Sequence, residues 1–238
     1  MDTMLGFTRV KVPEIKISRY IIMGKNVKRA KKNSKRLKDL ETFVYSTIEN
    51  KQLNYKNSNN ALTTSWYEAG QFMASDIGAE DGSDYGDPAR IGNSVTLMAQ
   101  RFNINLQKST SDEYNQVRII IAESVDGSTA LTIRDILRYH DYSIDGNLIF
   151  SSPYTTKTNA NKNYRIKMDK VFNLTPTKPT ANIEKVIKFS KSGKVVDYPG
   201  VGVSFPTNHC MNVFMVSDSF AVAHPFMDYA VRSTYKDA

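Results

Sequence analysis

The chain has 238 residues, of which 40% are hydrophobic and 11% aromatic, and its formal net charge is +8. These apolar side chains suffice for a sizeable core, but no run approaches the roughly 18 apolar residues of a membrane-spanning helix, and the N-terminal residues lack the continuous apolar centre of a secretory signal. We therefore expect a soluble protein, and the single cysteine, Cys210, excludes an internal disulfide framework and fits a reducing compartment.

The positive charge is concentrated at the N-terminal end. Residues 1–38 contain 12 basic and 2 acidic residues, a net charge of +10, whereas residues 39–238 contain 20 basic and 22 acidic residues, a net charge of −2. A near-neutral body with a cationic end predicts an arm that binds a polyanion, and the alternative is a solvated, disordered charge run. The predicted nucleic-acid-binding residues are Lys25, Lys28, Arg29, Lys31, Lys32, Lys35, Arg36 and Lys38.

Residues 1–41 are predicted to form this basic N-terminal arm. Its first part, Phe7–Ile22, has short alternating apolar patches broken by Pro13, and such a segment can add a strand to a neighbouring subunit or remain without fixed structure. The basic run has helical spacing of its apolar and small side chains, so we expect a helix that forms when phosphates neutralise the repulsion among its lysines. The residues at that spacing are Val27, Ala30, Ser34 and Leu37.

Residues 42–238 are predicted to form a single shell domain made of strands. Val95, Leu97 and Ala99 alternate in one phase and residues 102–106 in the opposite phase, which predicts one long strand with a bulge near Gln100–Arg101. The apolar run Val117–Ile121 predicts a strand that is buried on both faces. Further strands are predicted at Tyr164–Leu174, Ile183–Phe189, Met211–Val216 and Met227–Tyr235. Turns are predicted at Asp126-Gly127, Asp145-Gly146, Ser192-Gly193 and Pro199-Gly200.

One short helix interrupts the strands. Thr132 followed by Asp135 is typical of a capping box, and an apolar face that includes His140 follows it. The residues predicted to share that face are Ile133, Ile136, Leu137 and His140. The fold class that accommodates this pattern is all-β: a single eight-stranded antiparallel jelly-roll sandwich with a short helix and a basic N-terminal arm.

The sequence gives little reason to expect an enzyme, and we predict no catalytic residue, cofactor or metal ligand. The three histidines, His140, His209 and His224, have no metal-binding spacing. His209 and Cys210 would point to opposite faces of a strand, so a buried small residue beside a loop histidine is favoured over a thiol–imidazole pair. Gly200-x-Gly202 lacks the remainder of a dinucleotide-binding motif.

The loop Ala79–Arg90 leaves one metal question open. Asp81, Asp84 and Asp87 are three residues apart and could bind calcium at a subunit contact, although the spacing is not that of an EF-hand and such loops are usually solvated.

The order of several short motifs is similar to that of a known family. Each motif is weak, and their order along roughly Phe43 to Asp237 carries the likeness: Arg90-Ile91-Gly92-Asn93-Ser94-Val95, Val117–Ile121, Ile133–Leu137, Tyr164–Leu174 and Val231–Asp237. The order resembles the single jelly-roll capsid proteins of small circular single-stranded DNA viruses and the related satellite tobacco necrosis virus-like coats.

The resemblance implies a viral coat protein that self-assembles, as sixty copies, into a small icosahedral T=1 shell. It implies basic arms that package a single-stranded genome without reading its sequence; DNA is favoured as the genome, and RNA stays open. Lys28-Arg29-Ala30-Lys31-Lys32 also fits a nuclear localisation signal, which makes a host nuclear import receptor a further partner. The expected locations are the virion and, before or during assembly, the host nucleus.

Two other functions remain open from the sequence. A cellular nucleic-acid-binding β-sandwich with a basic tail would present aromatic side chains for base stacking, and the candidates are Tyr45, Tyr55, Trp66 and Tyr67, although core or loop positions are the favoured explanation of these residues. A jelly-roll lectin or hydrolase is the third alternative, and it lacks a convincing carboxylate pair.

Overall fold

The computed structural model of the protein describes residues 29–40, 50–69, 92–124, 131–155, 164–200, 206–220 and 223–237. The chain divides into two compact units, Met1–Ile48 and Glu49–Ala238. In the first unit, residues 29–40 form a helix, and in the second all the described strands form a sandwich. The predicted boundary between residues 41 and 42 stays a prediction, because residues 41–49 lie outside the described part.

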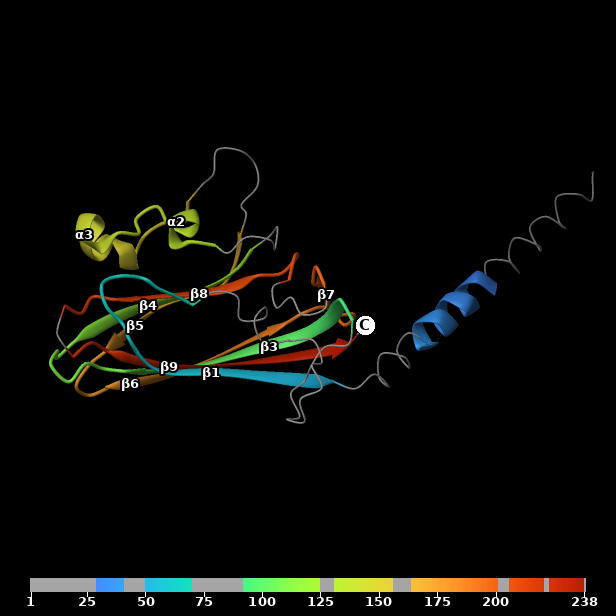
Figure 1. Cartoon of the computed structure of the whole chain (residues 1–238), viewed down its shortest axis with the longest axis horizontal. Helices are drawn as coiled ribbons and strands as arrows, with labels where there is room; N and C mark the ends of the chain where they lie inside the picture. Colours follow the sequence, from blue (N-terminus) through green and yellow to red (C-terminus); the bar gives the residue numbers. More distant parts are fainter. Residues whose placement is uncertain are drawn as a thin grey trace, which may run out of the picture. The chain divides into compact units, whose positions relative to one another are not determined.

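Two antiparallel sheets form the two layers of the second unit (Figure 1). Sheet A has the order β1 (Lys51–Ala61), β9 (Phe226–Asp237), β3 (Ser94–Gln107) and β6 (Thr180–Lys188), and β7 (Lys194–Asp197) also pairs with β3. Sheet B has the order β2 (Tyr67–Ala69), β8 (Met211–Ser217), β4 (Asn115–Ser124) and β5 (Tyr164–Leu174). Two four-stranded sheets in this order are a jelly roll, which confirms the predicted fold class, with β7 as a short addition.

Strand β4 shows why the apolar run was predicted to be buried on both faces. Val117, Ile119 and Ile121 belong to the core between the two sheets, whereas Ile120 and Ala122 belong to a second core on the opposite side of sheet B. Successive side chains of a strand point to opposite faces, so both faces of β4 need a cover. Sheet A covers the first face, and the helical segment between β4 and β5 covers the second.

That helical insert consists of three short pieces, α2 (Ile133–Ile136), α3 (Tyr142–Asp145) and the 3-10 helix η1 (Gly146–Phe150), which lie over sheet B (Figure 1). Only the first was predicted. Its capping box is present, since Asp135 Oδ2 accepts hydrogen bonds from Thr132 N at 3.0 Å and Thr132 Oγ1 at 2.8 Å. The prediction that His140 shares the face of this helix is wrong, because the helix ends at Ile136, four residues before it.

Arg118 of β4 fastens the insert to sheet B. Its guanidinium group donates to Asp169 of β5 through Nε at 3.0 Å and Nη2 at 2.7 Å, and to the carbonyl oxygens of Ile149 at 2.5 Å and Ser152 at 3.3 Å. Tyr154 donates to the same carboxylate at 2.8 Å, and burial together with this hydrogen bond raises the pKa of Tyr154 to about 12. The insert is therefore tied to the sheet by buried polar contacts as well as by its apolar face.

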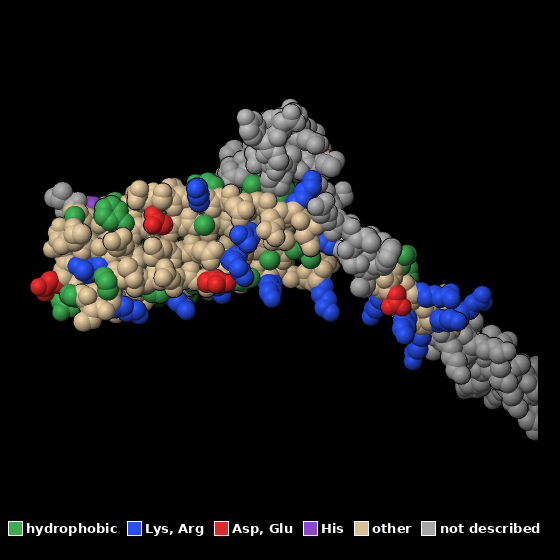
Figure 2. Space-filling view, turned by 90° about the horizontal axis from the view of Figure 1, so that it is seen from below, with side chains coloured by type: hydrophobic (Ala, Val, Ile, Leu, Met, Phe, Trp, Pro, Cys, Tyr) green, Lys and Arg blue, Asp and Glu red, His purple; other side chains and the backbone are tan. Residues whose placement is uncertain are grey.

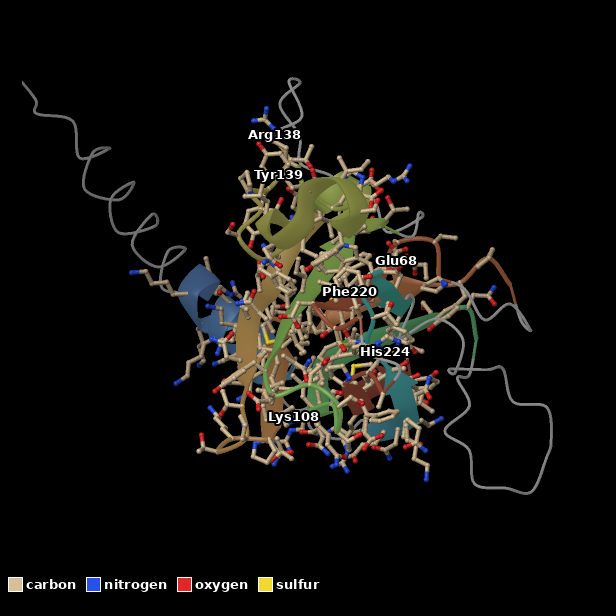
Figure 3. All side chains as sticks on the ribbon, turned by 90° about the vertical axis from the view of Figure 1, so that its left-hand side faces the viewer. Glu68, Lys108, Arg138, Tyr139, Phe220 and His224 are labelled. Carbon is tan, nitrogen blue, oxygen red and sulfur yellow. The ribbon has the colours of Figure 1, made fainter. Side chains whose placement is uncertain are left out.

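A second contact joins the insert to the neighbouring strand of sheet B. Glu68 Oε1 of β2 accepts a hydrogen bond from the backbone N of Ile133 at 3.1 Å, which satisfies a free donor at the start of α2. Figure 3 shows Glu68 below the insert, with Arg138 and Tyr139 at its far end.

Among the described helices, none combines the length and the apolar character that crossing a bilayer requires.

The predicted phase switch in the long strand exists, but its predicted position is wrong. The register of β3 against β9 shifts between Leu97 and Ala99, and Gln100 rather than Ala99 is the buried residue after the shift. Gln100 Nε2 donates to Ser233 Oγ at 3.4 Å, so a polar pair fills this inward position. The alternation of apolar residues predicted that Ala99 would be the buried residue, because glutamine is rarely buried.

The turn that follows β6 was predicted from Ser192-Gly193. Gly193 has a φ of +74°, a conformation that favours glycine, and a Cβ atom there would clash with Thr96 Cγ2 and lie 3.0 Å from Leu97 O. This turn therefore packs against β3 beside its bulge. Asp145-Gly146 instead joins α3 to η1, and Asp126-Gly127 lies outside the described residues.

Candidate nucleic-acid interface

The helix at residues 29–40 carries most of the predicted nucleic-acid-binding residues. All twelve residues of the helix are exposed, and the six basic ones that it contains are Arg29, Lys31, Lys32, Lys35, Arg36 and Lys38. Figure 2 shows these Lys and Arg side chains projecting from the helix. Lys25 and Lys28 lie outside the described residues. The helix predicted from the basic run is confirmed over residues 29–40, whereas its dependence on phosphates stays a prediction.

The basic side chains of this helix share one half of its circumference. At about 100° per residue, the six Lys and Arg positions fall within one half turn, together with Asp39. The other half contains the small and apolar residues, among which Leu37 is 60% exposed and Leu40 is 58% exposed. The helix is about 18 Å long and is thus a short rod with a continuous cationic face.

The electrostatics of this face favour a bound anion. Lys31 and Lys35, and likewise Lys32 and Arg36, are four residues apart, and like charges at that spacing destabilise an isolated helix by a few tenths of a kcal/mol per pair. Arg29 adds a positive charge at the helix N-terminus, where the helix dipole is also positive. Phosphate groups along this face would remove these repulsions. Such contacts bind a backbone and do not read bases.

A buried group of charges lies at the end of the sandwich that contains β7. Glu123 of β4 contacts Lys167 at 2.7 Å and Lys194 at 2.5 Å, and its Oε1 lies 3.4 Å from Nδ1 of the fully buried His209. Burial acts to raise the pKa of Glu123, but the contacts with His209 and the two lysines hold the pKa well below its usual range. Burial lowers the pKa of His209, against the opposing influence of Glu123.

These contacts explain the histidine and the cysteine without catalysis. The two residues directly precede β8 in a loop, and Cys210 is buried, which agrees with the favoured prediction of a buried small residue beside a loop histidine. His209 lies edge-on to the ring of Phe189, and Cys210 Sγ contacts Asn212 Oδ1 at 3.7 Å. No group of three or more His, Cys, Asp or Glu side chains that could hold a metal occurs within the described residues, and Asp81, Asp84 and Asp87 lie outside them.

The described aromatic residues proposed for base stacking are partly buried and pack against the cores of the domain. Tyr55 and Tyr67 pack against the core between the sheets, and both rings contact Tyr229, with centroid separations of 5.9 and 6.5 Å. Trp66 packs under the helical insert and donates from Nε1 to the backbone oxygen of His140 at 2.8 Å. Tyr45 lies outside the described residues. The three described side chains therefore stabilise the sandwich.

Sequence reasoning missed one basic feature of the sandwich. The register of sheet A places Arg101 of β3 directly opposite Arg232 of β9. The two arginines are far apart in the sequence, so only the strand pairing brings them together.

A scan of the sequence against protein-family models and a search of curated proteins found no match. Three solved virus structures are similar to this chain at low scores. Desmodium yellow mottle tymovirus gives a TM-score of 0.38 at 7% identity over 80% of this chain and 88% of that chain. Turnip yellow mosaic virus gives 0.33 at 9% identity over 81% and 95%, and Sacbrood virus of honeybee gives 0.37 at 11% identity over 81% and 74%. The jelly-roll fold follows from the strand order, independently of these scores.

Proposed function

We propose that this chain is the coat protein of a small virus, in which the jelly-roll domain builds a closed shell and the basic arm binds the single-stranded genome inside it. The observation that carries the proposal is the segregation of charge. Residues 1–38 have a net charge of +10 and the remaining residues −2, and the basic residues of the arm helix are exposed. The near-neutral domain can pack closely against copies of itself, while the arm remains strongly attracted to phosphate.

The shell is proposed to contain sixty copies in T=1 symmetry. Sixty arms would bring about 600 positive charges, which is the same order as the phosphates of a genome of about one to two thousand nucleotides. Lateral contacts between subunits would cover the edges of the sheets, which otherwise expose unpaired backbone groups. The location that follows is the virion.

We propose single-stranded DNA as the cargo, with nuclear import through Lys28-Arg29-Ala30-Lys31-Lys32. The order of motifs along the shell domain supports DNA, because it resembles the coats of small circular single-stranded DNA viruses. A genome copied in the nucleus would require its coat protein to enter that compartment, which a cluster of basic residues serves. Extraction of nucleic acid from particles and its digestion by DNase or RNase distinguishes the two kinds of cargo.

Imaging of the purified full chain, combined with nuclease protection, tests the proposed function. We expect uniform shells near 20 nm, about the size for sixty such subunits, that protect nucleic acid from digestion. Changing the six residues Lys28, Arg29, Lys31, Lys32, Lys35 and Arg36 to Gln should leave the domain folded and the shells empty. A control variant that exchanges Lys and Arg at these positions keeps the charge and should keep the cargo. Equal nucleic-acid content in the Gln variant, or a monomer at high concentration and low salt, would contradict the proposal.

The alternative is a cellular nucleic-acid-binding β-sandwich with a basic tail. It requires a monomer or small oligomer whose affinity for single strands comes from stacking on aromatic side chains. The packed positions of Tyr55, Trp66 and Tyr67 speak against such a platform. Affinity that falls on substitution of these aromatic residues in a non-assembling protein would favour it.

A further inference from the structure

Two arginines face each other across adjacent strands of sheet A. Arg101 and Arg232 are directly paired in the register of β3 and β9, which brings their Cβ atoms to about 5 Å, and like charges in this position destabilise a sheet. The Nε atom of Arg101 lies 3.3 Å from Glu184 Oε1, and the Nε atom of Arg232 donates to Asn54 Oδ1 at 2.8 Å. Arg101 of β3 therefore reaches toward β6 and Arg232 of β9 reaches toward β1, so the two guanidinium groups lie on either side of the paired backbone positions on an exposed face.

A shallow groove lies next to this pair. Its volume is about 580 Å³, within the range of pockets that hold small molecules, and it crosses all four principal strands of sheet A. The neighbouring row of the sheet pairs Lys56, Ala230 and Asn103, so the short side chain of Ala230 leaves space between a cation and an amide. The outward amides that line the groove belong to Asn103, Asn105 and Asn182, and its charged side chains are Lys56, Glu184 and Asp228.

The charge of this face is positive. At the outward-facing positions of β1, β9, β3 and β6, the exposed basic residues are Lys56, Arg101, Lys188 and Arg232, and the exposed acids are Glu184 and Asp228. Asp228 already accepts a hydrogen bond from the backbone N of Asn59 at 2.8 Å, at the bulge of β1. Figure 2 shows this face, on which Lys and Arg side chains are spread over the surface, with hydrophobic groups scattered between them.

We propose that the outer face of sheet A is a second binding surface for single-stranded nucleic acid. A phosphate lies between Arg101 and Arg232 and cancels their repulsion, and the adjoining nucleotide occupies the groove lined by asparagine amides. Guanidinium groups match the oxygen atoms of a phosphate, and amides can pair with the polar edges of bases. Phe226, at the start of β9, is the exposed aromatic side chain among the described outward positions of these strands, and the positions around the arginine pair are mostly polar or charged, which favours a nucleic acid over a second protein.

This inference extends the proposed function to the shell domain, and it rests on that function for the choice of nucleic acid as the polyanion. It does not require that the arm bind the genome. The arm-neutralised full chain, with the six arm residues changed to Gln, is therefore the background for the test. Lys25 and Lys38 remain in every protein compared, so a difference in affinity between variants in this background belongs to the shell domain.

The probe is a fluorescently labelled oligothymidylate of about 20 nucleotides, whose binding is followed by anisotropy at several salt concentrations. In the arm-neutralised background we expect R101Q/R232Q to weaken binding about tenfold or more and to reduce the salt slope by about 0.7, the value for one lost phosphate contact. The matched control R134Q/R165Q removes two exposed arginines from the insert and from sheet B. It should leave both quantities nearly unchanged.

A stability measurement separates this result from misfolding. Because the paired charges repel in the absence of an anion, R101Q/R232Q should be at least as stable to urea as its parent. Loss of stability together with loss of binding would overturn the inference, as would equal effects of the two double variants or no binding by the arm-neutralised parent. A heparin affinity that depends on these arginines while oligothymidylate affinity does not would assign the surface to sulfated polysaccharide and would also overturn it.

The two proposals can fail separately. Shells that contain the same nucleic acid with and without the arm charges would reject the arm as the packaging element, while the anisotropy result for sheet A would be unaffected. A change in sedimentation caused by R101Q/R232Q, without a change in oligothymidylate binding, would instead identify the face as a contact between copies of the chain.

Discussion

Arg118 is buried beneath the helical insert, where Asp169 and two backbone carbonyl oxygens surround its guanidinium group. The side chains of this ion pair are 5% and 16% exposed, whereas those of the pair between Arg101 and Glu184 are 49% and 58% exposed. A buried pair is costly to break because the remaining charge cannot return to water. An exposed pair contributes little because water screens it.

Asp169→Asn should therefore destabilise the domain far more than Glu184→Asn or Glu184→Gln. We expect a loss of about 3–5 kcal/mol in the free energy of unfolding for Asp169→Asn, since it leaves the charge of Arg118 without a counter-ion. For Glu184→Gln we expect at most about 1 kcal/mol. Urea unfolding followed by tryptophan fluorescence measures both. Similar losses for the two variants would show that the insert is not held by this ion pair.

His209 should make the domain sensitive to mild acid. Burial lowers its pKa, so the unfolded chain takes up a proton as the pH falls through the ordinary histidine value near 6.5, while the folded chain does so only at lower pH. The free energy of unfolding should fall as the pH is lowered from about 7 to about 5. Glu123, Lys167 and Lys194 face the ring, and the depressed pKa of Glu123 adds a further loss only below its usual range.

His209→Gln removes this titrating group and should flatten the decline. Urea unfolding at a series of pH values between 7 and 5 gives the slope for each protein, and the interval stays above the range in which Glu123 contributes. If the free energy of unfolding of the Gln variant falls with pH as steeply as that of the unmodified protein, the lowered pKa of His209 is not the cause of the acid sensitivity.

At the scale of elements, the turn between β6 and β7 depends on a glycine. Gly193→Ala should destabilise the domain by about 1–2 kcal/mol or more, because the positive φ is unfavourable for alanine and the added Cβ meets Thr96 and a backbone oxygen of β3. Gly200→Ala is the control, since nothing lies within 4 Å of its added Cβ. Thermal unfolding of both variants tests the difference, and equal midpoints would rule out the close packing of this turn.

Most of the apolar strands could be predicted from the sequence. Strands β3, β4, β5, β8 and β9 show clear alternation or a continuous apolar run, and their bounds agree with the predictions within a few residues. Strand β1 was missed because its inward positions include Asn57 and Asn60 and its outward positions are all polar or small. Its backbone pairs with β9 regardless of side-chain hydropathy. The three-residue strand β2 is too short for any periodicity.

The candidate sites also differ in whether they could be predicted from the sequence. The cationic helix is local, so the order of charges along the sequence was sufficient to predict it. The pairing of Arg101 with Arg232 depends on the register of two strands that are distant in sequence, and Glu123 gathers its partners from three other segments. Contacts of this kind follow from topology, which no local pattern contains.

The helix α3 was not predicted, although the sequence contains a start signal for it: Asp141 is the N-cap residue, and its Oδ1 accepts a hydrogen bond from Ser143 N at 3.0 Å.

At the scale of the whole molecule, the distribution of charge predicts how binding should respond to salt. If the six described basic residues of the arm helix each contact a phosphate, the logarithm of the affinity for single strands should fall with the logarithm of salt concentration with a slope of about −4. The arm-neutralised variant should retain only a small slope. Anisotropy titrations between about 50 and 300 mM salt measure it. A slope near zero for the unmodified chain would exclude a Coulombic mode of binding.

The pairing of β1 with β9 has a consequence during synthesis. Asn54 and Arg232 contact each other although they are 178 positions apart, so β1 must wait on the ribosome for its neighbour for on the order of 10 s. An unpaired apolar strand would recruit other nascent chains during that delay. The lysines, glutamine and asparagines of β1 keep it hydrated instead. The same polar composition that prevented the prediction of β1 from the sequence therefore reduces aggregation between nascent chains during translation.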